Sequence, residues 1–148
     1  MLRRMAGLGL LIALAAGAPA AAYSPHVNYM VNCQGCHLPN GAGMPNKVPD
    51  MRGQLGRFVS IPEGREYLVR VPGVANSKLS NAETAELLNW LVGVMGPATA
   101  AHSAPYTAEE VARLRPNRLQ APGVARQKVL ELLASGSAAA PDGRRRPN

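Results

Sequence analysis

The chain has 148 residues, of which 47% are hydrophobic but only 4% aromatic, and its formal net charge is +7. This length accommodates one domain with a leader and appendages rather than two independent cores. A core so poor in aromatic side chains favours a bound apolar cofactor, because small domains bury too little surface alone. The basic residues form no stripe interleaved with aromatics, so the usual nucleic-acid-binding pattern is excluded.

Residues 1–22 have the pattern of a secretory signal peptide. An Arg-Arg pair precedes an apolar run over residues 7–16, and small residues follow. A retained membrane anchor would need about 20 apolar residues, whereas this stretch is shorter and is broken by Pro19. We therefore expect cleavage after Ala20 or Ala22, a periplasmic mature protein and no retained membrane span.

The first helix of the mature chain is predicted to begin after Ser24. A serine N-cap followed by Pro25 at the first helical position is a typical helix start. This helix is expected to run towards Cys33. The segment after His37 is rich in glycine, proline and asparagine, so an irregular loop is expected through Pro49.

Two further helices are marked by their capping residues. Pro62 and Glu63 suit the first turn of a short helix, which the sequence Val71-Pro72-Gly73 is expected to end. Ser80 and Glu83 form an S-x-x-E capping box ahead of apolar residues at helical spacing. A longer helix is therefore predicted from Ser80 to the next Gly-Pro pair.

Two shorter helices are expected in the last third of the chain. Thr107 and Glu110 repeat the capping-box pattern, and a segment from Val124 to Leu133 carries apolar residues on one face. No β-pattern of useful length is present, so the predicted fold class is all-α with long irregular connections. The low-complexity residues from Ser135 onwards are too poor in bulky apolar groups to fold.

The sequence Cys33-Gln34-Gly35-Cys36-His37 reads C-x-x-C-H, the attachment signature of c-type haem. Two residues between the cysteines let both thiols reach the two vinyl-derived carbons of one porphyrin. The adjacent histidine is then turned under the ring, with its imidazole on the iron. We therefore predict that Cys33 and Cys36 hold one haem c covalently and that His37 is its proximal iron ligand.

Three other uses of a C-x-x-C pair fit this sequence less well. A redox dithiol normally follows a strand in an α/β pattern, which this sequence lacks. A structural zinc site needs four protein ligands, and a second Cys or His pair is missing. A structural disulfide is possible in an exported chain, although a bridge between cysteines this close would be strained. The expected export favours haem, because c-type haem is attached outside the cytoplasm.

Over about Pro25 to Met95 the chain resembles the small soluble class I cytochromes c. The resemblance rests on the helix before C-x-x-C-H, a G-x-G loop at Gly41, a proline twelve residues after the histidine, and a final helix bearing Trp90. In that family the carbonyl of the proline accepts the imidazole N–H of the ligating histidine, which orients the ring. The resemblance implies this role for Pro49.

One feature departs from the family pattern. The family supplies a methionine as sixth iron ligand from the loop before its last helix, but residues 69–78 contain neither Met nor His. A Val-Pro pair stands about where the family has Met-Pro. The sixth ligand is therefore unresolved, with Met95, Met44 and His102 as candidates, and we expect a reduction potential below that of ordinary His/Met cytochromes.

The resemblance divides the chain into a signal peptide (1–22), a haem domain (23–96), a helical extension (97–134) and a disordered basic tail (135–148). It implies an exported mono-haem c-type cytochrome that is an electron carrier and not an enzyme. Its redox partners are expected to be a dehydrogenase as donor and a downstream acceptor. Two alternatives stay open. The chain could be a cytochrome subunit of a dehydrogenase complex, bound through the extension, or a haem protein whose open distal site takes a small ligand or peroxide.

Overall fold

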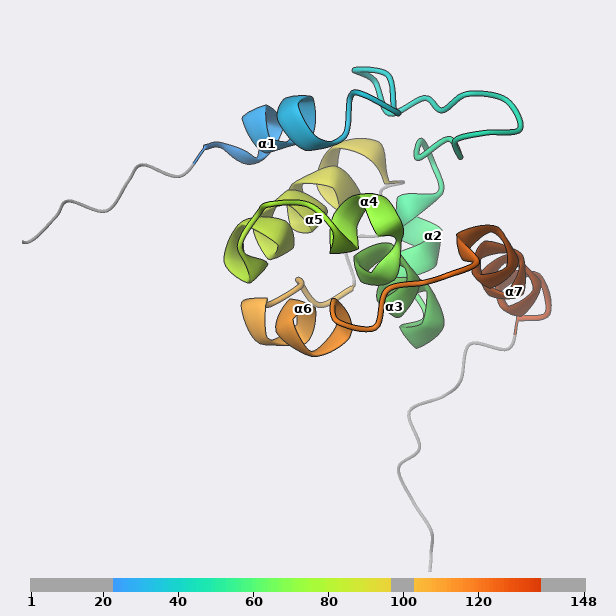
Figure 1. Cartoon of the computed structure of the whole chain (residues 1–148). Helices are drawn as coiled ribbons and strands as arrows, with labels where there is room; N and C mark the ends of the chain where they lie inside the picture. Colours follow the sequence, from blue (N-terminus) through green and yellow to red (C-terminus); the bar gives the residue numbers. More distant parts are fainter. Residues whose placement is uncertain (1–22, 97–102, 137–148) are drawn as a thin grey trace, which may run out of the picture.

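The computed structural model describes residues 23–96 and 103–136, so the expected signal peptide and nearly all of the expected tail lie outside the described residues. Within these ranges the fold is all-α, as predicted (Figure 1). Its helices are α1 (Pro25–Asn32), α2 (Leu55–Val59), α3 (Pro62–Arg70), α4 (Pro72–Ala75), α5 (Asn81–Met95), α6 (Ala108–Leu114) and α7 (Pro122–Ala134). None of these helices has both the length and the hydropathy needed to cross a membrane.

Helix α5 is the centre of the fold, and α1, α2 and α6 all pack on it (Figure 1). Its inward face buries Leu87, Leu88 and Leu91. On the side of α1, the ring of Trp90 lies 5.5 Å from that of His26 and 5.8 Å from that of Tyr29, between centroids. Trp90 therefore joins the helix that precedes the C-x-x-C-H motif to the core.

The two predicted capping boxes differ in the structure. At α5 both halves are present: the Ser80 hydroxyl accepts from the Glu83 backbone at 3.2 Å, and the Glu83 carboxylate accepts from the Ser80 backbone at 2.8 Å. At α6 the Thr107 hydroxyl accepts from the Glu110 backbone, but the Glu110 carboxylate pairs with Arg65 instead. The capping box predicted at α6 is therefore only half present, because the Glu110 carboxylate forms a long-range ion pair with Arg65 and does not cap the helix.

The short helices α2 and α4 were not predicted. Helix α2 has five residues, which is too few for an apolar periodicity to be recognised, and it buries Leu55, Phe58 and Val59. Helix α4 begins at Pro72, inside the sequence that was expected only to end α3. Val71 adopts an extended conformation (ψ 142°) between the two helices, so α3 ends as expected and a new helix starts at once.

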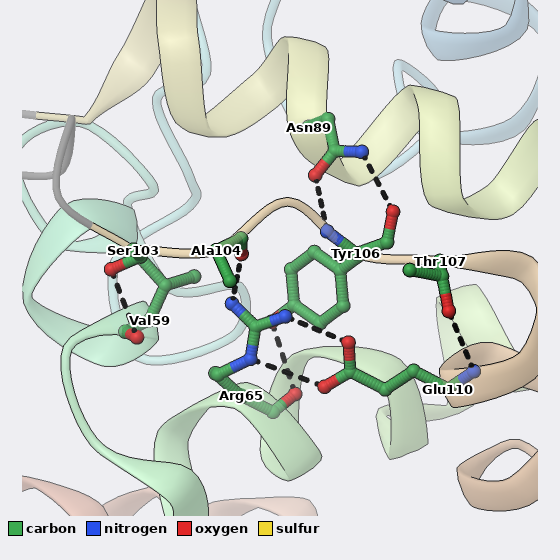
Figure 2. Close-up of polar contacts among 8 residues, drawn as sticks. All are labelled: Val59, Arg65, Asn89, Ser103, Ala104, Tyr106, Thr107 and Glu110. Atoms are coloured by element: carbon green, nitrogen blue, oxygen red, sulfur yellow. Dashed lines mark hydrogen bonds and ion pairs between the residues drawn. The ribbon is translucent and has the colours of Figure 1, made fainter.

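The C-terminal segment, residues 103–136, packs back onto the earlier helices. Helix α6 lies against α5 and α3, and α7 lies beside α3 and α2 (Figure 1). Asn89 of α5 exchanges two hydrogen bonds with the backbone of Tyr106, at 3.0 and 2.7 Å (Figure 2). Because Tyr106, Val111 and Val129 are all buried, the chain itself covers much of the apolar face of this segment.

Candidate cofactor site

A pocket of about 390 Å³ has the C-x-x-C-H motif on its wall. The motif forms a tight turn where α1 ends. The backbone N–H of Cys33 donates to the Tyr29 carbonyl at 2.9 Å, and those of Cys36 and His37 donate to the Cys33 carbonyl at 3.1 and 2.9 Å. This turn brings both thiols and the imidazole to the same pocket, so the three residues predicted to act together do lie together.

The two thiols are free and differ in environment: Cys36 is exposed and Cys33 is half-buried. Burial, with a smaller effect of Cys36, raises the pKa of the Cys33 thiol to about 11. A reactive redox dithiol depends on a lowered thiol pKa, so this environment argues against that alternative. In residues 23–96 and 103–136 no three His, Cys, Asp or Glu side chains gather as a metal site would require.

His37 has the properties of an iron ligand. Burial lowers its pKa, with the charge of Asp50 acting in the opposite direction, so the ring is neutral at neutral pH and one nitrogen keeps its lone pair. Its Nδ1 is buried without a hydrogen-bond partner in the described chain. A buried ring nitrogen without a partner is uncommon, and histidines that bind metals use both nitrogens, one on the metal and one on an acceptor.

Pro49, the predicted acceptor for His37, lines the same pocket, but no hydrogen bond joins the two residues. Its position depends on Gly43, because a Cβ at residue 43 would lie 2.0 Å from the Val48 carbonyl oxygen and 2.6 Å from that of Pro49. The backbone of Met44 closes the turn by donating to the Val48 carbonyl at 2.9 Å. The loop therefore holds Pro49 at the pocket, and its role towards His37 stays a prediction.

The candidates for the sixth ligand lie away from this pocket or outside the described residues. The sulfur of Met95 packs over Gly41, within 2.4 Å of where a Cβ would stand there, and Met44 is 41% exposed. Neither residue lines the pocket, and His102 is not among the described residues. Met51, which was not a candidate, supplies the one thioether that the described part of the chain places on the lining.

The segment predicted to face the iron does line the pocket. Val71 to Val74 form part of its wall. The loop that follows is fixed by Arg115 of the C-terminal segment, whose guanidinium donates to the carbonyls of Ala75 at 3.1 Å and Leu79 at 2.6 Å, and also to Ser77. The wall is thus held from outside by hydrogen bonds to the backbone.

Besides Asn32, Lys47 and Asp50, the sequence analysis missed three polar residues of the pocket that come from later helices: Gln54 at the start of α2, Tyr67 on α3 and Arg126 on α7. They lie far apart in the sequence, and no spacing pattern links them. The packing of α2, α3 and α7 on one another brings them to one pocket. The rest of the lining is mostly apolar and includes Phe58 and Leu91.

No family model matches the chain. It is similar to a cytochrome c-552 of Thermus thermophilus, with 31% identity over 129 residues that cover 74% of this chain and 87% of the relative. A second cytochrome c-552 of Thermus thermophilus is 33% identical over 106 residues, which cover 59% of this chain and 81% of that relative. Both matches span most of the relative.

Proposed function

This chain belongs to the c-type cytochromes, and from that premise we propose that it carries single electrons between an exported dehydrogenase and a downstream acceptor. Cytochromes c hold haem c covalently through two cysteines, and this chain has two. We assign both thioethers to Cys33 and Cys36 and the iron to His37. The observation that carries this assignment is the buried, unpartnered Nδ1 of His37 in a pocket shared with both thiols.

The pocket residues suit an electron carrier. When bound, a haem supplies a one-electron couple whose potential depends on its axial ligands and on burial. The chain contributes apolar side chains such as Phe58, Leu68 and Leu91, which keep water from the pocket. It also contributes the neutral imidazole of His37 and two thiols for attachment. Electron transfer needs no further acid, base or nucleophile.

Export is part of the proposal. Covalent attachment outside the cytoplasm agrees with the signal pattern over residues 1–22, so we infer a processed, periplasmic protein. Mass spectrometry of the mature N-terminus should place it near Ala21 or Tyr23. Recovery of an intact Met1 form with covalent haem would contradict export while leaving haem attachment intact.

Haem attachment is tested with Cys33→Ala, Cys36→Ala and the double variant. Each single change removes one thioether and should weaken covalent attachment, and the double change should abolish it. The measurement is haem staining of denaturing gels, normalised to protein. Undiminished staining of the double variant would overturn the proposed function.

Binding of a small ligand or peroxide at the iron is a second candidate function, favoured by one observation. The wall from Val71 to Val74 has neither thioether nor imidazole, while Met44 and Met95 lie off the lining. Carbon monoxide binding to the ferrous protein tests for an open position. A ferric sulfur-to-iron charge-transfer band that disappears in Met51→Ala would instead identify Met51 as the sixth ligand and remove this candidate.

A tightly bound subunit of a dehydrogenase complex would need the C-terminal segment as an interface. Because Tyr106, Val111 and Val129 are buried against the earlier helices, less apolar surface is left there for a partner. We therefore favour the diffusing carrier over the bound subunit. Co-purification of a dehydrogenase with the tagged protein at high salt would reverse that preference.

A further inference from the structure

Arg126 is a cation of the pocket lining that has no ion-pair partner among the described residues, and Asp50, the carboxylate of the same lining, pairs with Arg52 instead. It lies on α7 and is partly buried, with its guanidinium carbon 5.8 Å from the centre of the Phe58 ring. Among the described residues no carboxylate pairs with it and no group accepts a hydrogen bond from it. Arg65, which is also partly buried, pairs with Glu110 at 2.7 Å. A guanidinium held against apolar surface is costly unless an anion or hydrogen-bond acceptors compensate for lost water.

Two further polar groups that carry the argument line the same pocket, those of Tyr67 and Gln54. Burial raises the pKa of Tyr67, and the charge of Arg126 acts against that rise, which places the hydroxyl within the electrostatic reach of the guanidinium. Gln54 has a buried amide oxygen without a partner. It lies one turn before Phe58, whose backbone N–H donates to the Gln54 carbonyl at 3.0 Å. Turning the amide would present its NH₂ group to an acceptor instead.

We propose that Gln54, Tyr67 and Arg126, together the carboxylate site, bind a propionate carboxylate of the haem. The proposal rests on the proposed function, because a haem carries carboxylates into a pocket that is otherwise mostly apolar. A planar guanidinium matches a carboxylate with two parallel hydrogen bonds, and the amide and hydroxyl add donors. Arg126 would position the cofactor through a propionate and not through the iron.

The proposal gives the C-terminal segment a part in the cofactor site. Pro122, Gly123 and Arg126 all line the pocket, so α7 forms one of its walls. Lys47 is the other cation on the lining, but it is exposed. Water reaches the exposed Lys47 more fully than the partly buried Arg126, so Arg126 has the stronger requirement for an anion.

The test compares the holoprotein with Arg126→Gln and with a matched control, Lys128→Gln. Lys128 lies on the same helix, is exposed and does not line the pocket. A positive charge beside the haem favours the ferrous form, which carries one positive charge fewer than the ferric form. Arg126→Gln should therefore lower the midpoint potential clearly more than Lys128→Gln does, and the shift should persist at high salt, where effects of exposed charges are screened.

A second readout separates a binding role from a merely structural one. Losing its cation should raise the pKa of the carboxylate, so the midpoint potential of Arg126→Gln should change more steeply with pH near neutral pH than that of the parent protein. Arg126→Lys keeps the positive charge, so its midpoint potential should lie close to that of the parent. If Arg126→Gln does not fold, Arg126→Lys replaces it in the comparison with Lys128→Gln. Equal potentials and pH profiles for Arg126→Gln and Lys128→Gln would overturn the inference. Absence of covalent haem in the parent protein would instead overturn the proposed function.

Discussion

At the scale of single residues, Gly43 is one of two described positions, with Gly64, where the neighbouring backbone leaves no room for a side chain. A Cβ there would meet the carbonyls of Val48 and Pro49. We expect Gly43→Ala to lower the free energy of unfolding by about 1–3 kcal/mol, as overpacked positions do. Gly93→Ala is the control, because nothing lies within 4 Å of a Cβ at that helical position. It should be neutral or stabilising by about 0.5–1 kcal/mol. Denaturant unfolding measures both, and equal effects would contradict the close contact.

Residues whose chemistry needs a fixed local spacing could be predicted from the sequence. The C-x-x-C-H motif placed Cys33, Cys36 and His37 on one turn, and the structure brings them to one pocket. Gln54 and Arg126 could not be predicted, because each has an ordinary local context and is brought to the pocket only by packing. The sixth iron ligand has the same difficulty, since its expected loop has no thioether or imidazole to recognise.

At the scale of elements, the capping box of α5 makes stability depend on pH. The Ser80 backbone N–H, and then its hydroxyl, hold the pKa of Glu83 below its ordinary value of 4.5. A lowered pKa in the folded state means that the stabilisation is present above about pH 4.5 and is lost as pH falls through the lowered pKa. Glu83→Gln should therefore be less stable than the parent at pH 7 and converge with it in acid. Unfolding curves at several pH values decide, and a difference between the two proteins that does not change with pH would contradict this role of Glu83.

The ion pair between Arg65 and Glu110 joins α3 to α6 (Figure 2). Their side chains are only 18% and 19% exposed, whereas Arg70 and Glu66 of the comparison pair are 30% and 49% exposed. A double-mutant cycle on Arg65 and Glu110 should give a coupling free energy of about 1–2 kcal/mol, against about 0.3–0.5 kcal/mol for the more exposed pair. Equal coupling free energies in the two cycles would show that burial does not strengthen the ion pair between Arg65 and Glu110.

Helices with a capping signal and several turns were predictable, and short ones were not. Helices α1 and α5 begin at the expected N-caps, Ser24 and Ser80. Helices α2 and α4 were missed because they are stabilised mainly by what they pack against rather than by their own sequence. The part of the pocket lining that α2 forms, with Leu55 and Phe58, was missed with it, whereas the segment of α4 was expected at the site although its helix was not.

At the scale of the whole molecule, positive charge should govern encounters with partners. The formal charge is +7, and about +5 once the leader with its two arginines is removed. We expect the rate of reduction by an acidic redox partner to fall as ionic strength rises, because salt screens the steering field. Stopped-flow measurements with and without residues 144–146 would assign the share of the tail. A rate independent of salt in both proteins would exclude electrostatic docking.

Because α7 forms part of the pocket lining, the attachment motif and its complete pocket are not synthesised at the same time. Residues 33–37 leave the ribosome long before Pro122–Ala134, so the attachment motif is made while one wall of its pocket does not yet exist. A chain that stops before residue 122 would therefore keep the full attachment motif but lack the part of the pocket lining that Pro122, Gly123 and Arg126 form.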